Sequence, residues 1–218
     1  MAPWLVAIDL QRIFAAPSSP WASPDFDRAF SVIQELAPRF GPRVLLTRWL
    51  PTADRSTSWG EYFAQWPFAD RNPDDPLFDL IDDARVLSAH PTLDLPTFGK
   101  WGPELVGAIA QAERRIGGQA VDTAEGTAES AEWTVGPVDS RTAPSWSLDR
   151  APSLILTGVA TDCCVIATAL AAGDAGARVQ VVADACAGST PDNHAAAMQV
   201  MGLFPPQVSI VDSTAVQG

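Results

Sequence analysis

The sequence predicts a three-layer α/β fold, in which a doubly wound sheet of about six parallel strands carries helices on both faces. Short apolar runs such as PWLVAIDL and SLILTGV alternate with amphipathic, capped segments, which is the pattern of a parallel sheet covered by helices. The chain has 218 residues, of which 47% are hydrophobic, and this is enough for one sizeable core. We therefore expect residues 1–218 to form a single domain.

Six apolar runs are the expected strands, and they cover residues 3–10, 43–49, 84–90, 153–159, 177–185 and 207–213. Helices are expected over residues 25–39, 59–66, 102–115, 162–172 and 190–204. In the first helix, Phe26, Phe30 and Ile33 recur at helical spacing, and Ser23 or Asp25 is available as its cap. Right-handed crossovers would join these elements into a Rossmann-like sheet. Such a sheet binds its ligand beyond the carboxyl ends of the strands.

Residues 117–150 interrupt the alternation. They are rich in Gly, Ala, Thr, Ser and Glu and show little periodicity. A stretch of this length without periodicity is either functional or flexible. We expect a flexible insertion, with a cover over the pocket as the alternative.

Charge and cysteine content restrict the class of protein. The net charge of −12 disfavours nucleic acid and anionic membranes as partners. Three cysteines without framework spacing indicate reduced thiols in a cytosolic protein. The start, MAPWLVAIDL, reads as a strand and not as a signal peptide, and no apolar run is long enough to span a bilayer. We expect a cytoplasmic protein without a membrane partner.

A carboxylate, an ammonium group and a thiol follow three different expected strands. Asp9 ends the first strand, Lys100 follows the third, and Cys163 and Cys164 follow the fourth. Each has an ordinary alternative, since an aspartate commonly closes a turn, an isolated lysine is commonly solvated and a cysteine is commonly core. Because all three groups fall at one edge of the sheet, a catalytic site there becomes a serious alternative to these ordinary roles.

The chemistry of these three groups is coherent. A free thiol is mostly protonated at neutral pH, and a helix N-terminus with a nearby ammonium group would favour its thiolate. A carboxylate in reach could take the proton as a general base. Histidine usually has this task, but His90 and His194 are the only histidines of the chain. Neither has an obvious place at the site, although His90 could approach it.

With these residues collected, the sequence resembles the isochorismatase-like cysteine hydrolase superfamily, in its metal-free amidohydrolase-like branch. AIDLQRIF resembles the family motif D-x-Q-x-x-F, TFGKWG resembles its lysine segment, and TGVATDCCVIAT resembles its nucleophile segment G-V-x-T-x-x-C-V-x-x-T. VVADACAGSTPDNHAAAMQVM resembles the region after its fifth strand. The ordered set covers most of the chain except residues 117–150.

The resemblance implies a catalytic triad of Asp9, Lys100 and Cys164 that hydrolyses a C–N bond through a covalent thioester-type intermediate. It also implies a cis peptide bond between Val159 and Ala160. The backbone N–H groups of Ala160 and Cys164 would then form the oxyanion hole. The substrate would be a small amide or carbamoyl compound, and homo-oligomers, either dimers or tetramers, are the habit of the family.

One departure from the family concerns metal. Metal-dependent nicotinamidases of this superfamily follow the second strand with aspartate and histidine ligands. The matching stretch here is TRWLPTADRS, with Trp49 and Pro51 near those places. A zinc-type site lacks its usual ligands, so we expect no metal and no cofactor, and nicotinamidase activity is disfavoured.

Several side chains are candidates for the substrate pocket. The candidates are Gln11, Phe14, Trp49, Phe98 and Trp101, with Trp59 and Tyr62 in neighbouring segments. Their aromatic character favours a small-molecule substrate with a flat or apolar portion. The alternative is that several of them simply pack loops onto the sheet.

Two other functions stay open beside the amidohydrolase. One is a true isochorismatase, which cleaves a vinyl ether and can dispense with the thiol. The other is a ligand-binding or thiol-sensing protein that keeps the fold and uses Cys163 and Cys164 as redox elements. An intact Cys164 argues against the first alternative, and intact Asp9 and Lys100 argue against the second.

Helical geometry predicts different roles for the two adjacent cysteines. In a helix starting near Asp162, Cys163 shares a stripe with Ile166 and Leu170 and would press on the sheet. Cys164 would lie in the first turn, near unpaired backbone N–H groups. The family motif also places its cysteine directly before the valine of CCV. We expect Cys164 to be the nucleophile and Cys163 to be packing.

Overall fold

The computed structural model of the protein describes residues 2–119 and 152–218. The described residues form one six-stranded sheet in the order β3-β2-β1-β4-β5-β6, and every strand pair is parallel. The strands are β1 (Trp4–Ile8), β2 (Val44–Trp49), β3 (Leu93–Leu95), β4 (Ser153–Val159), β5 (Arg178–Ala187) and β6 (Val208–Val211). The expected doubly wound fold is therefore confirmed.

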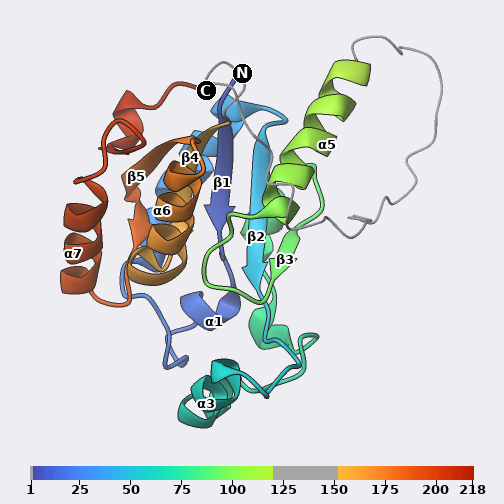
Figure 1. The fold of residues 1–218 in the computed structure, drawn as a ribbon, viewed down its shortest axis with the longest axis vertical. Coiled ribbons are helices and arrows are strands. Elements are labelled where there is room, and N and C mark those ends of the chain that lie inside the picture. Colours follow the sequence, from blue (N-terminus) through green and yellow to red (C-terminus); the bar gives the residue numbers. More distant parts are fainter. Residues whose placement is uncertain (1, 120–151) are drawn as a thin grey trace.

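Helices cover both faces of this sheet. The α-helices are α1 (Arg12–Ala15), α2 (Phe26–Leu36), α3 (Ser58–Gln65), α4 (Asp82–Arg85), α5 (Pro103–Gln119), α6 (Ile166–Asp174) and α7 (Pro191–Met201). One core joins α2 to one face of the sheet, and a second core joins α5, α6 and α7 to the other (Figure 1). Side chains of β1 alternate between the two cores, with Leu5 and Ala7 in the first and Trp4, Val6 and Ile8 in the second.

The third strand lies later in the chain than expected. Residues 84–90 are not a strand, because α4 occupies Asp82–Arg85 and Val86 after it is 83% exposed. The observed β3 is short, and Leu93 and Leu95 of this strand are buried on either side of the exposed Asp94. An edge strand of three residues carries too short an apolar pattern to be separated from the preceding run.

Helix ends also differ from the expected ones. Helix α2 stops at Leu36, and a 3₁₀ turn, Ala37–Phe40, follows it with Pro38 near its start. Neither expected cap contributes, since Asp25 makes no side-chain cap hydrogen bond and the Ser23 hydroxyl donates to the carbonyl oxygen of Gly188 at 2.6 Å. Helix α5 continues to Gln119, so the first three residues of the expected insertion are helical. The remainder, from residue 120 to 150, lies outside the described residues.

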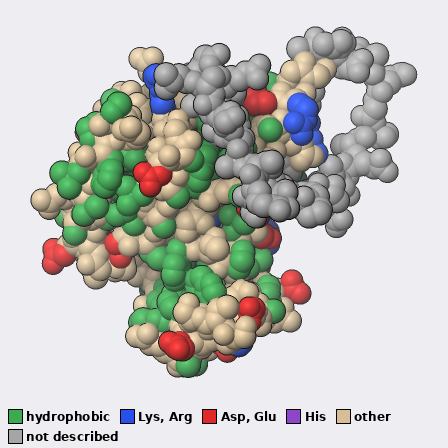
Figure 2. All heavy atoms as spheres, viewed as in Figure 1, with side chains coloured by type: hydrophobic (Ala, Val, Ile, Leu, Met, Phe, Trp, Pro, Cys, Tyr) green, Lys and Arg blue, Asp and Glu red, His purple; other side chains and the backbone are tan. Residues whose placement is uncertain are grey.

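The order of the strands reverses between β1 and β4. The connections from β1 through β2 to β3 run one way, and those from β4 through β5 to β6 run the other. A ligand crevice is expected beyond the carboxyl ends of these two strands. Helices α1 and α3 lie at this end of the sheet (Figure 1). Figure 2 shows hydrophobic side chains gathered where the segment carrying α3 joins the rest of the molecule.

No helix in the described part of the chain combines the length and the apolar character that a bilayer crossing requires.

Gly158 allows β1 and β4 to approach at the crevice. Its φ is +105°, and an added Cβ would lie 2.1 Å from the backbone oxygen of Ile8. Gly176 has a similar φ of +89°, but nothing lies within 4 Å of its Cβ position. An alanine at Gly176 would therefore meet only the cost of an unfavourable φ, whereas an alanine at Gly158 would meet that cost and a steric clash as well.

We expect Gly158→Ala to destabilise the protein far more than Gly176→Ala. Gly176→Ala should cost about 1–2 kcal/mol, because only the positive φ is unfavourable. Gly158→Ala should cost at least ~2 kcal/mol more, because the backbone of β1 cannot move away from the new Cβ without breaking the sheet. Denaturant unfolding of both variants measures the difference, and equal losses would contradict a steric role for Gly158.

Candidate active site

Asp9 follows β1 directly and is fully buried. Its φ is +53°, in the left-handed region that aspartate enters more easily than most residues. Thr47 of β2 holds the side chain, since its hydroxyl donates to Oδ1 at 2.8 Å and also accepts from the Asp9 N–H at 3.3 Å. Oδ2 has no hydrogen-bond partner among the described residues. One carboxylate oxygen is thus fixed by the sheet and the other is left for chemistry.

Lys100 forms a buried ion pair with this carboxylate. Its Nζ lies 3.0 Å from Asp9 Oδ2, with both side chains 0% exposed, and it donates to the Thr97 carbonyl oxygen at 2.9 Å. The contact to Oδ2 is electrostatic, since it does not have hydrogen-bond geometry. The buried charges therefore compensate each other, as buried charges in proteins must.

Thr168 of α6 connects the lysine segment to the cysteine turn. The Lys100 backbone N–H donates to the Thr168 hydroxyl at 2.8 Å, and that hydroxyl donates to the Cys164 carbonyl oxygen at 2.6 Å. Gly99 allows the close approach, because a Cβ there would lie 3.3 Å from the Ala167 oxygen. Sequence reasoning missed Thr168, whose position resembles any polar residue on a helix.

The two cysteines lie on a single turn of π-helix, Thr161–Val165, that precedes α6. The Val159–Ala160 peptide bond before this turn is cis. The carbonyl oxygen of Ala160 accepts the N–H groups of Cys163 at 3.0 Å and Val165 at 3.1 Å. The expected α-helical start near Asp162 is therefore wrong. The assignment of different helix faces to Cys163 and Cys164, which assumed an α-helix, does not hold either.

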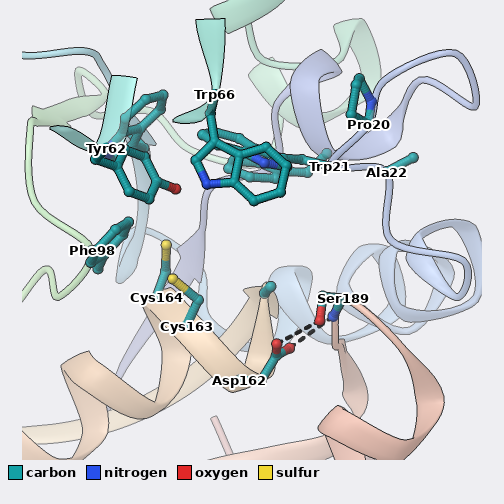
Figure 3. A pocket seen from close by; sticks show the side chains of 13 residues that line it. Pro20, Trp21, Ala22, Tyr62, Trp66, Phe98, Asp162, Cys163, Cys164 and Ser189 are labelled. Atoms are coloured by element: carbon teal, nitrogen blue, oxygen red, sulfur yellow. Dashed lines mark hydrogen bonds between the residues drawn. The ribbon is translucent and has the colours of Figure 1, made fainter. Parts of the chain in front are cut away.

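Both thiols point into the same cavity (Figure 3). Cys164 is buried and also belongs to the core beside α6, whereas Cys163 is only half-buried. The wider π turn places successive side chains differently from an α-helix, and Cys163 both packs against the core beside α6 and lines the cavity. The third cysteine, Cys186, lies in the core.

The hydrogen bond between the two thiols moves their pKa values in opposite directions. It lowers the pKa of Cys163, against the effects of burial and of the nearby Asp162 charge. The same hydrogen bond raises the pKa of Cys164 well above its ordinary value, and burial and the Asp9 charge add to the rise. The charge of Lys100 lowers the pKa of both thiols. Cys164 therefore keeps its proton in the unliganded protein, and it needs a base to become a nucleophile.

A cavity of about 320 Å³ opens above the thiols. Its lining consists of Phe14, Pro20, Trp21, Ala22, Trp49, Tyr62, Trp66, Phe98, Ala160, Asp162, Cys163, Cys164 and Ser189. Three of the five pocket candidates, Phe14, Trp49 and Phe98, are in this lining. The other two are not, since the Gln11 amide is bonded to the backbone of Trp49 and Phe78 and Trp101 packs against the α5–α7 core.

Sequence reasoning missed two aromatic side chains of the cavity, Trp21 and Trp66. Trp21 contacts Trp49, Tyr62 and Trp66 with ring centroids 5.5, 5.8 and 5.8 Å away. It comes from the Pro/Ser-rich turn after α1 and Trp66 from the end of α3, segments that carry no periodic pattern. Trp59 contacts Tyr62 and Phe98 from behind and does not line the cavity.

Asp162 is the charged side chain in the described lining, and it is already bonded. Ser189 donates to its two oxygens through its N–H at 2.7 Å and its hydroxyl at 2.6 Å (Figure 3). These two hydrogen bonds hold the loop after β5 against the cysteine turn. No lysine or arginine stands among the lining residues that the structure describes.

The two histidines have other contacts. His90 bonds the Pro42 carbonyl oxygen at 2.6 Å and contacts Trp4, at the amino end of the sheet, so it does not approach the thiols. His194 bonds the Thr161 hydroxyl at 2.9 Å, and burial lowers its pKa. Within residues 2–119 and 152–218, no three His, Cys, Asp or Glu side chains gather to hold a metal ion.

We compared the sequence and the fold with those of known proteins. The Isochorismatase domain family matches residues 148–214. No match is found among curated proteins. A cysteine hydrolase from Pseudomonas syringae pv. phaseolicola has a similar structure, with a TM-score of 0.65 and 15% identity over 97% of this chain and 89% of its own.

Two further structures are similar over nearly the whole chain. An isochorismatase family protein from Desulfovibrio vulgaris gives a TM-score of 0.65 and 19% identity over 97% of this chain and 94% of its own. A pyrazinamidase/nicotinamidase from Streptococcus mutans gives a TM-score of 0.57 and 15% identity over 96% of this chain and 100% of its own. At these identities the likeness concerns the fold.

We expect Cys163→Ala to lower the pH at which Cys164 becomes reactive. The substitution removes the hydrogen bond that is the main cause of the raised pKa of Cys164, so its thiolate forms at lower pH. The rate of Cys164 alkylation by iodoacetamide, followed by mass spectrometry across pH, gives the midpoint. Cys186→Ala should leave the midpoint unchanged, and a midpoint that rises in Cys163→Ala would show that the thiol pair is described wrongly.

Proposed function

The chain belongs to the isochorismatase-like hydrolase superfamily by its family domain and its fold, and on that premise we propose that it is a cysteine hydrolase. It cleaves the C–N bond of a small amide or carbamoyl compound through a thioester-type intermediate on Cys164. The observation that carries the proposal is the buried Asp9–Lys100 pair, which acts on the Cys164 thiol at the base of the cavity. No other part of the described structure combines a nucleophile with a buried base.

Asp9 accepts the proton of the Cys164 thiol. Its Oδ2 is free of hydrogen-bond partners within the described residues, and Thr47 fixes Oδ1. Because the pKa of Cys164 is raised, proton transfer accompanies attack. Sγ then forms a bond to the carbonyl carbon, the C–N bond breaks, and the proton passes from Asp9 to the leaving nitrogen. Water next attacks the thioester carbon, gives one proton to Asp9, and Cys164 leaves and recovers its proton.

Lys100 has two electrostatic roles in this mechanism. Its ammonium group compensates Asp9 in a region without solvent, and its positive charge favours the thiolate of Cys164. The N–H groups of Ala160 and Cys164 form the oxyanion hole in this proposal. The Ala160 carbonyl oxygen accepts from Cys163 and Val165, and the Cys164 N–H between them is not among its donors.

Cys164 rather than Cys163 is the nucleophile because of its surroundings. Apart from its partner thiol, Asp9 and Lys100 are the charged groups that act on Cys164. On Cys163, by contrast, the charge of Asp162 has a larger effect than either. The Asp162 carboxylate is held by Ser189, which donates one hydrogen bond to each of its oxygens.

The site supports the two alternative functions less well. A vinyl ether substrate of the isochorismate type carries carboxylates, and the described lining offers Asp162 and no cation to receive them. A thiol sensor would need the two cysteines and would have no use for a buried ion pair, which is costly to form.

The proposal predicts ammonia release that depends on Cys164. Purified protein should release ammonia from at least one member of a panel of primary amides and carbamoyl compounds. Cys164→Ala should reduce the rate by about ten-thousandfold or more, since the nucleophile is lost. Cys163→Ala should keep the rate within about tenfold.

Folding and specificity controls accompany this assay. Cys186→Ala replaces the thiol that lies in the core away from the cavity and should keep the wild-type rate. Thermal melting separates inactive variants from unfolded ones. Normal turnover by Cys164→Ala together with a dead Cys163→Ala would reverse the assignment, and no turnover of any amide would overturn the proposal.

We expect activity to survive metal removal. Trp49 and Pro51 stand near the places where metal-dependent relatives supply ligands, and neither side chain binds a metal in proteins. The measurement is ammonia release before and after chelation and dialysis, with metal analysis of the same sample. Activity that disappears with the chelator and returns with zinc or iron would show that this expectation is wrong.

A further inference from the structure

The cavity has a distinctive balance of hydrogen-bonding groups. Six of its thirteen described lining residues are aromatic, and none is a lysine or arginine. Ser189 donates to Asp162 and accepts from the Asn193 amide at 2.9 Å, and Asp162 is the charged acceptor of the described lining. A substrate that enters therefore meets no cation among the described lining residues.

Tyr62 supplies an unused donor. Figure 3 shows its hydroxyl pointing into the cavity, on the side facing the two cysteines. Burial raises the pKa of Tyr62, and the charges of Cys163 and Cys164 raise it further, so the phenol keeps its proton. No residue in the described part of the chain forms a hydrogen bond with this hydroxyl.

A second unused donor belongs to the same wall. Trp49 lines the cavity and is 1% exposed, and its Nε1–H is buried without a partner among the described residues. A buried donor without an acceptor costs free energy that a suitable ligand recovers. Both donors lie on rings that pack against Trp21, at 5.5 Å for Trp49 and 5.8 Å for Tyr62.

The position of Tyr62 is fixed by its neighbours. Its ring contacts Trp59 at 5.3 Å and Phe98 at 5.4 Å between centroids. Helix α3, which carries it, begins at a Thr57 cap whose side chain accepts the Trp59 N–H at 3.3 Å. The hydroxyl is thus held in place before a ligand arrives, which limits the entropy lost on binding.

We propose that the substrate has no carboxylate and carries, beyond its scissile amide, a hydrogen-bond acceptor such as a carbonyl or ether oxygen that accepts from the Tyr62 hydroxyl. The inference rests on the proposed function for the identity of the scissile group. Tyr62 is the specificity-determining residue. Carboxylates are excluded because no cation of the described lining would pair with them and the charge of Asp162 would repel them.

Three phenylacetamides of nearly equal shape test this inference. They carry a para-acetyl group as a neutral acceptor, a para-isopropyl group without an acceptor, or a para-carboxylate. Their binding to Cys164→Ala, which cannot turn them over, is measured through the fluorescence of the cavity tryptophans. We expect the acetyl compound to bind about tenfold more tightly than the isopropyl compound, and the carboxylate to bind most weakly.

Tyr62→Phe, introduced into the same background, removes only the hydroxyl. The acetyl and isopropyl compounds should then bind about equally, while the affinity for the isopropyl compound and the melting temperature stay unchanged. Glu61→Gln, at an exposed position of the same helix, should keep the acetyl preference. A preference that survives Tyr62→Phe, tighter binding of the carboxylate, or no binding of any compound at millimolar concentration would overturn the inference.

The same compounds separate this inference from the proposed function. If wild-type protein releases no ammonia from any amide while the Tyr62-dependent preference is present in binding, the hydrolase proposal fails and the assignment of Tyr62 stands. If amides are hydrolysed but the acetyl and isopropyl compounds have equal kcat/KM, the hydrolase proposal stands and the assignment of Tyr62 fails.

Discussion

The buried ion pair between Asp9 and Lys100 is the interaction on which the rest of the site depends. Both side chains are 0% exposed, so either charge alone would be left without solvent or partner, at a cost of about 3–5 kcal/mol. The pair therefore requires β1 and the segment after β3 to meet, although 90 residues separate them in the chain. Thr47 and Thr168 hold its two ends. The geometry that serves the chemistry is also what makes the charges tolerable.

The cysteine turn is built onto this pair from the other side. Thr168 accepts from the Lys100 backbone and donates to the Cys164 carbonyl oxygen, so Cys164 and Lys100 share one support. The π turn brings a second thiol to the cavity and lets it bond to the first. That bond, together with burial, keeps the proton on Cys164. The base that the proposed mechanism assigns to Asp9 is thus called for by the raised pKa of the packed Cys164 thiol.

The cavity wall is a separate structure that the sheet does not determine. Its rings come from the turn after α1, from the end of β2, from α3 and from the segment before Lys100. Trp21 contacts four of the other cavity rings, those of Phe14, Trp49, Tyr62 and Trp66. The sheet edge therefore supplies Asp9, Lys100 and the cysteine turn, and the segments between the strands supply most of the aromatic wall of the cavity.

The sequence by itself determined the layered fold and placed Asp9, Lys100 and Cys164 at one edge, because buried parallel strands leave continuous apolar runs and their carboxyl ends meet. Local spacing could not locate β3, whose three residues are too few to form a pattern, nor could it distinguish a π turn from an α-helix at Cys163. Only the tertiary structure decided that Gln11 bonds backbone while Tyr62 faces the cavity, and that Trp21 and Trp66 complete its wall. These are contacts between segments distant in the chain, and such contacts depend on packing, which no local periodicity records.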